Sequence, residues 1–340
     1  MPLTNPLNLT KKKVMIVAEI GNNHEGNFKI AKKLIDEAKS CKVDAVKFQT
    51  FNKDLFYANN QKKSHKKLKK FNLSFYEFKK LSQYAKKKNL IFFSTPLDLL
   101  SAENLNSIQN LFKVASSDNN YFDLIKKIAS FKKDIIISTG YADIKLIKKI
   151  ESKILNTWRN KKKKLNLAFL HCVSSYPTKF NESNIFTIKN LKEKLSKKTI
   201  IGYSDHTVGI ETSLLAVSLG ARIIEKHFTL DKKFSSFRDH TLSSDPKEMK
   251  NLVVKIRHLE KMMKYNKKIP QFSEITTLKF NRRSCAISAD LKAGEKIFEK
   301  DIIGVRPMLG IPINKKKIFI NKKLKKNLKA GSILKLNHIK

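Results

Sequence analysis

The strongest constraint on this chain is a regular alternation over residues 1–265, in which short apolar runs are separated by longer amphipathic segments. Continuous apolar runs of this length are typical of parallel strands that are buried on both faces. Eight such units in series, over roughly 250 residues, predict a (β/α)8 TIM barrel. The eight runs begin at Val14, Ala45, Leu90, Leu111, Asp134, Leu167, Ile200 and Arg222.

The segments between the runs carry helical patterns. In Lys29–Lys39 the apolar residues fall on one helical face, and Asp123–Phe131 and Glu248–Met262 behave likewise. Asn27 and Asp98 are the expected N-caps of two helices. The alternative fold is an open doubly wound sheet, which usually has fewer strands and a glycine-rich first turn. No GxGxxG motif occurs in this chain.

The chain changes character after the eighth unit. Residues 266–280 are polar and predict a linker. Residues 281–340 hold short β-like runs with two similar turns, at 292–294 and 329–331, and predict a small, mostly β domain. The polar stretch 52–72 is rich in lysine, and we expect it to be a long loop over the barrel mouth.

Composition narrows the classes of function. The formal net charge is +42, but lysines on predicted helix faces supply nearly all of the excess, and Trp158 is the only tryptophan. We interpret this charge as a solvated lysine surface and expect no nucleic-acid partner, although a nucleic-acid-binding module remains the alternative class. No apolar run is long enough for a membrane span or a signal peptide, so we expect a cytoplasmic protein without a membrane partner.

Polar side chains end nearly every predicted strand, and in a TIM barrel these ends meet at one mouth. Two of them, Lys47 and Lys113, lie within otherwise apolar strands. A buried ammonium group requires an anionic partner, because its desolvation otherwise costs several kcal/mol. Protein carboxylates are one possible partner. A phosphate or carboxylate ligand, held by a ring of lysines and hydroxyls, is the partner that we favour.

Two histidines, His206 and His227, follow the seventh and eighth predicted strands at equivalent positions. Adjacent parallel strands lie about 4.8 Å apart, so the two imidazoles are expected to share one ion. Two nitrogen ligands without a thiolate leave the coordination open, which suits Mn²⁺ or Mg²⁺ acting as a Lewis acid on a carbonyl oxygen. The alternative is a pair of hydrogen-bonded core histidines.

Seven motifs occur in order along the first 228 residues. They are AEIGNNHEG from Ala18, VKFQTF from Val46, FSTP from Phe93, STG from Ser138, HCVSSYPT from His171, GYSDHT from Gly202 and EKHF from Glu225. Together they resemble the bacterial N-acetylneuraminate (sialic acid) synthases, which include legionaminic and pseudaminic acid synthases. The tail segments DLKAGEKI and GVRP resemble the small antifreeze-like (SAF) domain of that family.

The resemblance implies a metal-dependent condensation of phosphoenolpyruvate with N-acetylmannosamine or a related 2,4-diacetamido hexose, in a domain-swapped homodimer. It implies that Glu19 is the catalytic carboxylate and that His206 and His227 hold Mn²⁺, Mg²⁺ or Co²⁺. The implied phosphoenolpyruvate contacts are Lys47, Thr95, Lys113, Ser116, Ser138, Ser174 and Ser204. The implied sugar contacts are Gln49, Asp118, Tyr176, Asp239 and, from the SAF domain of a partner subunit, Arg306.

Some positions depart from the family pattern on the sugar side. Asp118 and Ser174 stand where neuraminate-forming members carry glutamate and asparagine, and the chain reads SSFRDHTLSSDP in place of the usual GPDH. The identity of the sugar is therefore left open. A second enzyme class also remains, namely a Schiff-base aldolase or a 3-deoxy-octulosonate or -heptulosonate synthase. A Schiff-base aldolase would need no pair of metal-binding histidines.

Overall fold

The computed structural model describes residues 5–52, 56, 61, 69–159, 164–264 and 267–340. They form two compact units, residues 1–265 and 266–340. Most of the stretch 52–72, predicted to be a loop over the barrel mouth, lies outside the described residues. Within the described part, no helix is both long and apolar enough to cross a membrane.

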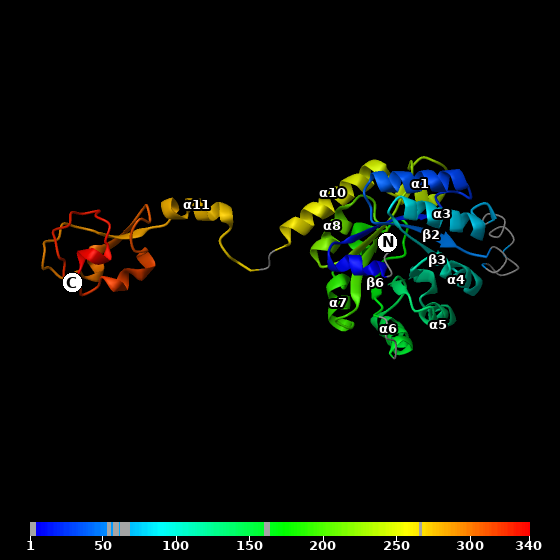
Figure 1. Ribbon diagram of the computed structural model, residues 1–340, viewed down its shortest axis with the longest axis horizontal. Helices are drawn as coiled ribbons and strands as arrows, with labels where there is room; N and C mark the ends of the chain where they lie inside the picture. Colours follow the sequence, from blue (N-terminus) through cyan, green and yellow to red (C-terminus); the bar gives the residue numbers. More distant parts are fainter. Residues whose placement is uncertain (1–4, 53–55, 57–60, 62–68, 160–163, 265–266) are drawn as a thin grey trace. The chain divides into compact units, whose positions relative to one another are not determined.

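The first unit is a barrel of eight parallel strands (Figure 1), which confirms the predicted TIM barrel. The strands follow the order β3-β2-β1-β8-β7-β6-β5-β4, and β3 lies against β4 to close the barrel. Each strand begins at the predicted residue or one residue later. The strands are β1 Met15–Gly21, β2 Ala45–Thr50, β3 Ile91–Pro96, β4 Leu111–Val114, β5 Asp134–Ser138, β6 Leu167–Cys172, β7 Ile200–Asp205 and β8 Ile223–His227.

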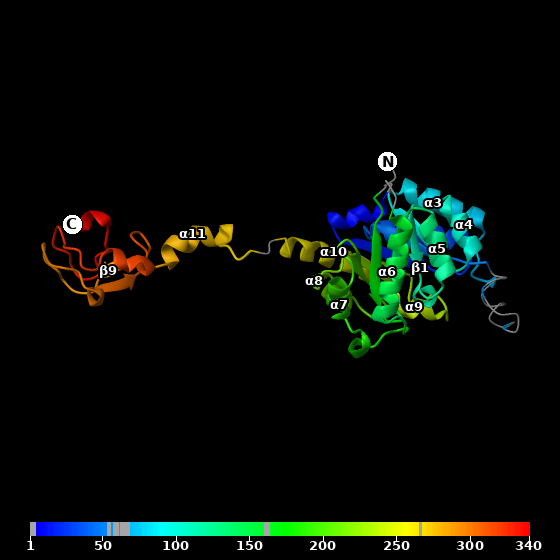
Figure 2. The ribbon, with the colours of Figure 1, turned by 90° about the horizontal axis from the view of Figure 1, so that it is seen from below.

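Helices surround the barrel on its outside (Figures 1 and 2). The side chains of Asn27 and Asp98 accept backbone N–H groups at the starts of α1 and α4, so both predicted N-caps are confirmed. The helices of this unit are α1 Phe28–Ser40, α3 Phe75–Lys87, α4 Leu99–Asn106, α5 Phe122–Ser130, α6 Ile144–Trp158, α7 Thr187–Lys194, α8 Glu211–Ser218, α9 Arg238–Leu242 and α10 Pro246–Met262.

Alternate residues of each strand point to the barrel axis, because side chains of a strand alternate between its two faces. The inward residues below the mouth form one apolar cluster that includes Met15, Val17, Phe93 and Leu170. The outward residues pack against the helices in a second, larger cluster. The 3-10 helix η1 (Pro6–Lys11) adds Leu7 to the inner cluster and closes the end of the barrel opposite the mouth.

The second unit is small and mostly irregular. Strands β9 (Ser284–Ile287) and β10 (Ile302–Val305) form an antiparallel pair, and isolated β-bridges connect further segments to each other. Its own apolar core includes Cys285 and Phe319. The helix α11 (Phe272–Asn281) occupies much of the segment that the sequence predicts as a linker. Short 3-10 helices complete the unit, at Glu299–Asp301 (η4), Ile313–Ile318 (η5) and Leu336–His338 (η6).

The loop after β1 contains a buried histidine that makes stability depend on pH. His24 is fully buried, its Nδ1 accepts a hydrogen bond from Gly26 N at 3.0 Å, and its Nε2 has no partner among the described residues. Burial lowers the pKa of His24 to about 4. The folded chain therefore holds this imidazole neutral, whereas the unfolded chain binds a proton below about pH 6.5.

We predict that the free energy of unfolding decreases as the pH falls from about 6.5 towards about 4, because only the unfolded state takes up this proton. Between pH 7 and pH 5 the His24 contribution to this loss is about 2 kcal/mol. In His24→Asn the amide oxygen replaces the Nδ1 acceptor without titrating, so urea unfolding of this variant should depend less on pH. Equal pH dependence of both proteins would contradict the assignment.

Candidate active site

The inward-facing residues become polar at the carboxyl ends of the strands, where they line a cavity of about 240 Å³. We call it the barrel cavity. Twelve of the fifteen residues that the sequence predicts for the site line it. They are Glu19, Lys47, Gln49, Thr95, Lys113, Ser116, Ser138, Ser174, Tyr176, Ser204, His206 and His227.

The other three predicted residues are not among the described lining of the barrel cavity. Asp118 lies at the end of the 3-10 helix η2 (Ser116–Asp118). Asp239 lies in α9 and is 9% exposed, and its Oδ1 accepts a hydrogen bond from Arg238 Nε at 3.4 Å. Arg306 belongs to the second unit, where its Nε donates to Asn281 O at 2.8 Å. Their sugar contacts therefore stay predictions.

Two lysines and two glutamates form a buried ionic cluster in the cavity. Lys47 Nζ lies 2.8 Å from Glu19 Oε1 and 3.6 Å from Glu225 Oε1. Lys113 Nζ lies 3.4 Å from the same Glu225 oxygen, which also accepts a hydrogen bond from Ser204 Oγ at 3.0 Å. Protein carboxylates thus pair with both ammonium groups, whereas the sequence favoured a ligand in this role. The reason is the strand register, which places Glu19 directly beside Lys47.

Burial and charge shift the pKa values of this cluster in different directions. Burial raises the pKa of Glu19, and the charge of Lys47 offsets this effect only in part. Burial also disfavours the charged forms of Lys47 and Glu225. The neighbouring groups of opposite charge have the larger effect, however, so the pKa of Lys47 is raised and the pKa of Glu225 is lowered. Burial lowers the pKa of Lys113 because Glu225 compensates incompletely. An added anion would therefore stabilise the charged form of Lys113.

The two imidazoles lie together at the ends of β7 and β8, as predicted. The ring centroids of His206 and His227 are 5.5 Å apart, with 55° between the ring planes. His206 Nδ1 donates to Val173 O at 2.8 Å, which leaves a lone pair on Nε2. His227 Nδ1 is buried without a partner among the described residues, and burial lowers the pKa of this imidazole well below its usual value.

This donor set fits a divalent ion that has other positions open for water or substrate. Imidazole nitrogens are suitable ligands in their neutral form, and a carbonyl hydrogen bond to the second ring nitrogen is common in metal-binding histidines. No group of three or more His, Cys, Asp or Glu residues in the described part of the chain is placed to hold a metal. The ion-binding role of His206 and His227 therefore stays a prediction.

Serine hydroxyls around Gly140 form a second feature of the cavity. Gly140 N donates to Ser116 Oγ at 3.1 Å, while Ser138 Oγ and Ser174 Oγ are buried with no hydrogen-bond partner in the described structure. A Cβ atom on Gly140 would lie 2.2 Å from Ser174 Oγ and 2.7 Å from Ser116 Oγ. Glycine thus lets these hydroxyls approach each other. We call these three serines and Gly140 the hydroxyl cradle, whose free donors suit phosphate or carboxylate oxygens.

An ion pair on the outward side of the strands supports the two histidines. Asp205 and Lys226 are register partners in β7 and β8, and each directly precedes one of the histidines. Lys226 Nζ lies 3.0 Å from Asp205 Oδ2 and 2.9 Å from Thr207 O, and both charged side chains are at most 1% exposed. Asp205 also accepts hydrogen bonds from Thr207 N at 2.9 Å and Ser213 Oγ at 2.6 Å. This network fixes the two strand ends relative to each other.

The sequence analysis assigned no role to several residues that line the barrel cavity, among them Glu225, Cys172 and Tyr141. Glu225 lies two residues after the inward Ile223, and Cys172 lies two residues after the inward Leu170, so the alternation along β8 and β6 was the signal for both. The Cys172 Sγ lies 3.8 Å from His206 Nδ1. Tyr141 lies in the loop after β5, where no such periodicity exists.

Comparisons with known proteins agree with this architecture. Residues 34–268 match the NeuB family, and residues 282–340 match the SAF domain. The chain is 38% identical over 337 residues to the N,N'-diacetyllegionaminic acid synthase of Campylobacter jejuni, an alignment that covers 95% of this chain and 99% of that protein. It is 33% identical to the pseudaminic acid synthase of Campylobacter jejuni, with 96% of each chain covered.

A solved structure extends the comparison to three dimensions. The crystal structure of N-acetylneuraminic acid (sialic acid) synthetase from Leptospira borgpetersenii, in complex with citrate, aligns with a TM-score of 0.72 and 36% identity. The alignment covers 78% of this chain and 90% of that one. The family resemblance that the seven motifs indicate is confirmed.

The outward ion pair yields a stability prediction. Lys226→Met leaves the Asp205 carboxylate buried without its cation, so we expect the free energy of unfolding to fall by about 3–5 kcal/mol. Asp205→Asn combined with Lys226→Met should restore part of this loss. Lys88→Met, which breaks the exposed pair with Asp36, serves as a matched control with a much smaller effect. Equal denaturation midpoints for Lys226→Met and Lys88→Met would contradict the prediction.

Proposed function

Because the chain belongs to the NeuB family and carries a SAF domain, we propose that it condenses phosphoenolpyruvate with the aldehyde of an N-acylated amino hexose. The chain is an enzyme, a transferase of the sialic acid synthase type. The proposed products are a nonulosonic acid and inorganic phosphate. The observation that carries the proposal is one buried cavity that combines two lysines, serine hydroxyls without partners and two adjacent imidazoles.

Phosphoenolpyruvate, with its phosphate and carboxylate, supplies the anionic charge that the barrel cavity favours. The charge of Lys113 is only partly compensated, because Glu225, its carboxylate partner, also contacts Lys47. The hydroxyls of Ser138 and Ser174 have free donors for oxygen atoms of the ligand. Bound in this way, the substrate would have its phosphate held by charge and hydrogen bonds, which orients its C3 for attack.

The reaction begins when C3 of phosphoenolpyruvate forms a carbon–carbon bond with the aldehyde carbon. The raised pKa of Glu19 suits proton transfer at this carboxyl, and its Oε2 has no described partner, so we assign Glu19 as the group that protonates the nascent hydroxyl. Water then adds at C2, and the proton that it loses returns to Glu19. Cleavage of the C2–O bond releases phosphate with the hydrogen of the new C2 hydroxyl, leaving a ketone.

We assign different roles to the two carboxyl groups because their pKa values are pushed apart. The lowered pKa of Glu225 keeps it ionised, so it holds the ammonium groups of Lys47 and Lys113 in place. His206 and His227 are the residues that would hold a divalent ion, with Mn²⁺ as our first choice and Mg²⁺ or Co²⁺ as alternatives. Such an ion would supply Lewis-acid activation of the aldehyde.

For the sugar we propose a 2,4-diacetamido hexose, with N-acetylmannosamine as the alternative. The near full-length similarity to a N,N'-diacetyllegionaminic acid synthase supports the first choice, and so does the departure from the neuraminate pattern at Asp118. Gln49 and Tyr176 line the barrel cavity and are proposed sugar contacts. Asp239 and, in a homodimer, Arg306 of the partner subunit are proposed to complete the site.

The function is tested by phosphate release. We expect the protein to release phosphate from phosphoenolpyruvate in the presence of Mn²⁺ and one member of a panel of 2-acetamido and 2,4-diacetamido hexoses. A chelator should abolish the reaction, and added Mn²⁺ should restore it. His206→Ala should lower kcat by more than about 100-fold without unfolding the protein, while His258→Ala, the same change at an exposed residue of α10, should leave it unchanged. Full activity of His206→Ala in chelator would refute the metal role.

The hydroxyl cradle generates a separate prediction. In Gly140→Ala the added methyl group forces Ser116 and Ser174 apart, so KM for phosphoenolpyruvate should rise by about tenfold or more. The KM for the sugar should change much less, because the atoms nearest to the new methyl group belong to Ser116 and Ser174 and not to the proposed sugar contacts Gln49 and Tyr176. Initial rates measured with each substrate varied in turn separate the two constants. An unchanged KM for phosphoenolpyruvate would place the phosphate elsewhere.

A further inference from the structure

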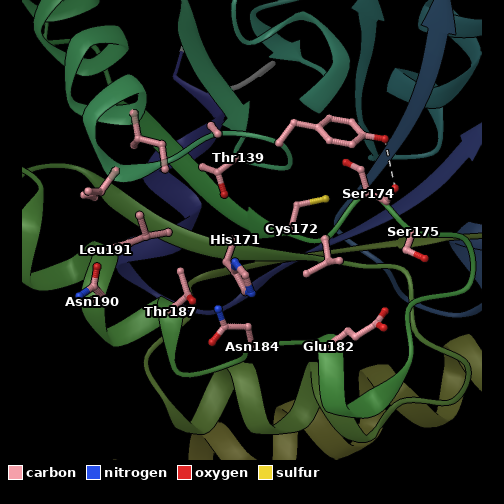
Figure 3. A pocket seen from close by; sticks show the side chains of 15 residues that line it. Thr139, His171, Cys172, Ser174, Ser175, Glu182, Asn184, Thr187, Asn190 and Leu191 are labelled. Atoms are coloured by element: carbon pink, nitrogen blue, oxygen red, sulfur yellow. Dashed lines mark hydrogen bonds between the residues drawn. The ribbon is translucent and has the colours of Figure 1, made fainter.

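A second cavity, of about 470 Å³, lies beside the barrel cavity (Figure 3). It is lined by the loop between β5 and α6 and the first turn of α6, by the end of β6 and the loop that follows it, and by α7. We call it the accessory pocket. Its polar side chains include Thr139, His171, Glu182, Asn184, Thr187 and Asn190.

The accessory pocket has a charge unlike the rest of the chain. None of the described residues that line it is a lysine or an arginine, although the sequence contains 71 of them. Glu182 is its one acidic residue. His171 Nε2 donates to Ser183 O at 2.8 Å, and burial lowers the pKa of this imidazole, so His171 is neutral and presents Nδ1 as an acceptor. The pocket therefore offers nothing to attract an anion and suits a neutral ligand.

Several polar groups in this pocket are free to bind. The side chains of Glu182, Asn184, Thr187 and Asn190 make no hydrogen bond with any described residue. In Figure 3 Asn184 and Thr187 lie next to His171, whereas Glu182 lies apart from them on the same side of the pocket. Two amides, a hydroxyl and a carboxylate provide both donors and acceptors, which is the set that neighbouring sugar hydroxyls and an acetamido group require.

Apolar side chains complete the lining. Ile144, Ile147 and Leu191 lie among the polar groups of the pocket. Small-molecule sites commonly combine such an apolar surface with a few converging polar groups, and this volume lies within their usual size range. A hexose ring with an N-acyl group has this dual character, because its methyl and C–H groups pack on aliphatic carbon while its hydroxyls and amide form hydrogen bonds.

The accessory pocket shares part of its lining with the barrel cavity. Tyr141, Cys172 and Ser174 line both. Tyr141 Oη donates to Ser174 O at 3.2 Å, while the Oγ of the same serine belongs to the hydroxyl cradle. Tyr141 is 79% exposed and has a φ of 64°, an uncommon value for a bulky residue. A ligand in the accessory pocket would therefore contact the segment that positions Ser174.

We propose that the accessory pocket is a second carbohydrate site, which binds a neutral N-acylated hexose and is coupled through Tyr141 and Ser174 to the hydroxyl cradle. The coupling, though not the binding, rests on the proposed function, because the cradle is assigned there to phosphoenolpyruvate. Occupancy of this pocket would change the apparent affinity for the anionic substrate without any contact between the two ligands.

The test counts binding sites for N-acetylmannosamine by calorimetric titration of the full-length protein. We expect Asn190→Trp, whose indole fills the accessory pocket from an exposed position on α7, to bind one sugar fewer per chain than the wild type. Asn156→Trp makes the same change at an exposed position on α6 outside the pocket and should bind as many sugars as the wild type. Glucuronate, an anionic sugar of similar size, should not compete for the site that Asn190→Trp removes.

Other results would overturn the inference. The same number of sites in the wild type and in Asn190→Trp excludes a second carbohydrate site in this pocket. If raising the sugar concentration alters the apparent KM for phosphoenolpyruvate equally in the wild type and in Asn190→Trp, the coupling is wrong. Failure of the proposed function is distinguishable, because phosphate release would then be absent with every sugar while the site sensitive to Asn190→Trp would still be counted.

Discussion

Side chains alternate between the two faces of each strand in the closed barrel, and this alternation determines both which residues form the core and which line the active-site cavity. Along β1, the inward positions are Met15 and Val17 and then Glu19, so one row of side chains changes from apolar to ionisable within a few residues. The same change occurs on β2 and β4, where Lys47 and Lys113 follow apolar inward residues. The packed lower layers hold the strands rigidly, and rigid strands hold the polar layer in register.

Burial of four ionisable groups in that polar layer is tolerated because they are paired. Each ammonium group contacts at least one carboxylate, so the cluster avoids the cost of isolated buried charges. The pairing is unequal, since one Glu225 oxygen serves two lysines and Ser204. The cluster is thus stable enough to fold yet remains responsive to an incoming anion. The large positive charge of the whole chain is a different matter, because its lysines lie mainly on exposed surfaces.

Much of the fold was predictable from the sequence because the periodicity of apolar residues reports on each strand or helix by itself. Apolar runs located the starts of the eight strands to within one residue, and the two histidines proved to be neighbours, since they lie at the ends of adjacent strands. Contacts between residues distant in the sequence were harder to predict. The partners of Lys47 and Lys113 depended on strand register, and the accessory pocket depends on how two loops and α7 pack, which no periodicity reveals. Arg306 lies in the second unit, outside the periodic pattern of the barrel.

The register pair Asp205 and Lys226 has a consequence for how the barrel assembles. Each of these residues alternates with an imidazole, so a shift of β8 by one residue along β7 would turn His227 towards the helices and Lys226 towards the axis. In such an arrangement the carboxylate of Asp205 would remain buried but would lose the contact with its cation. The residues that flank the histidines therefore raise the free energy of a misaligned barrel. The same sequence positions that place the two imidazoles at the barrel mouth also favour the correct pairing of β7 and β8.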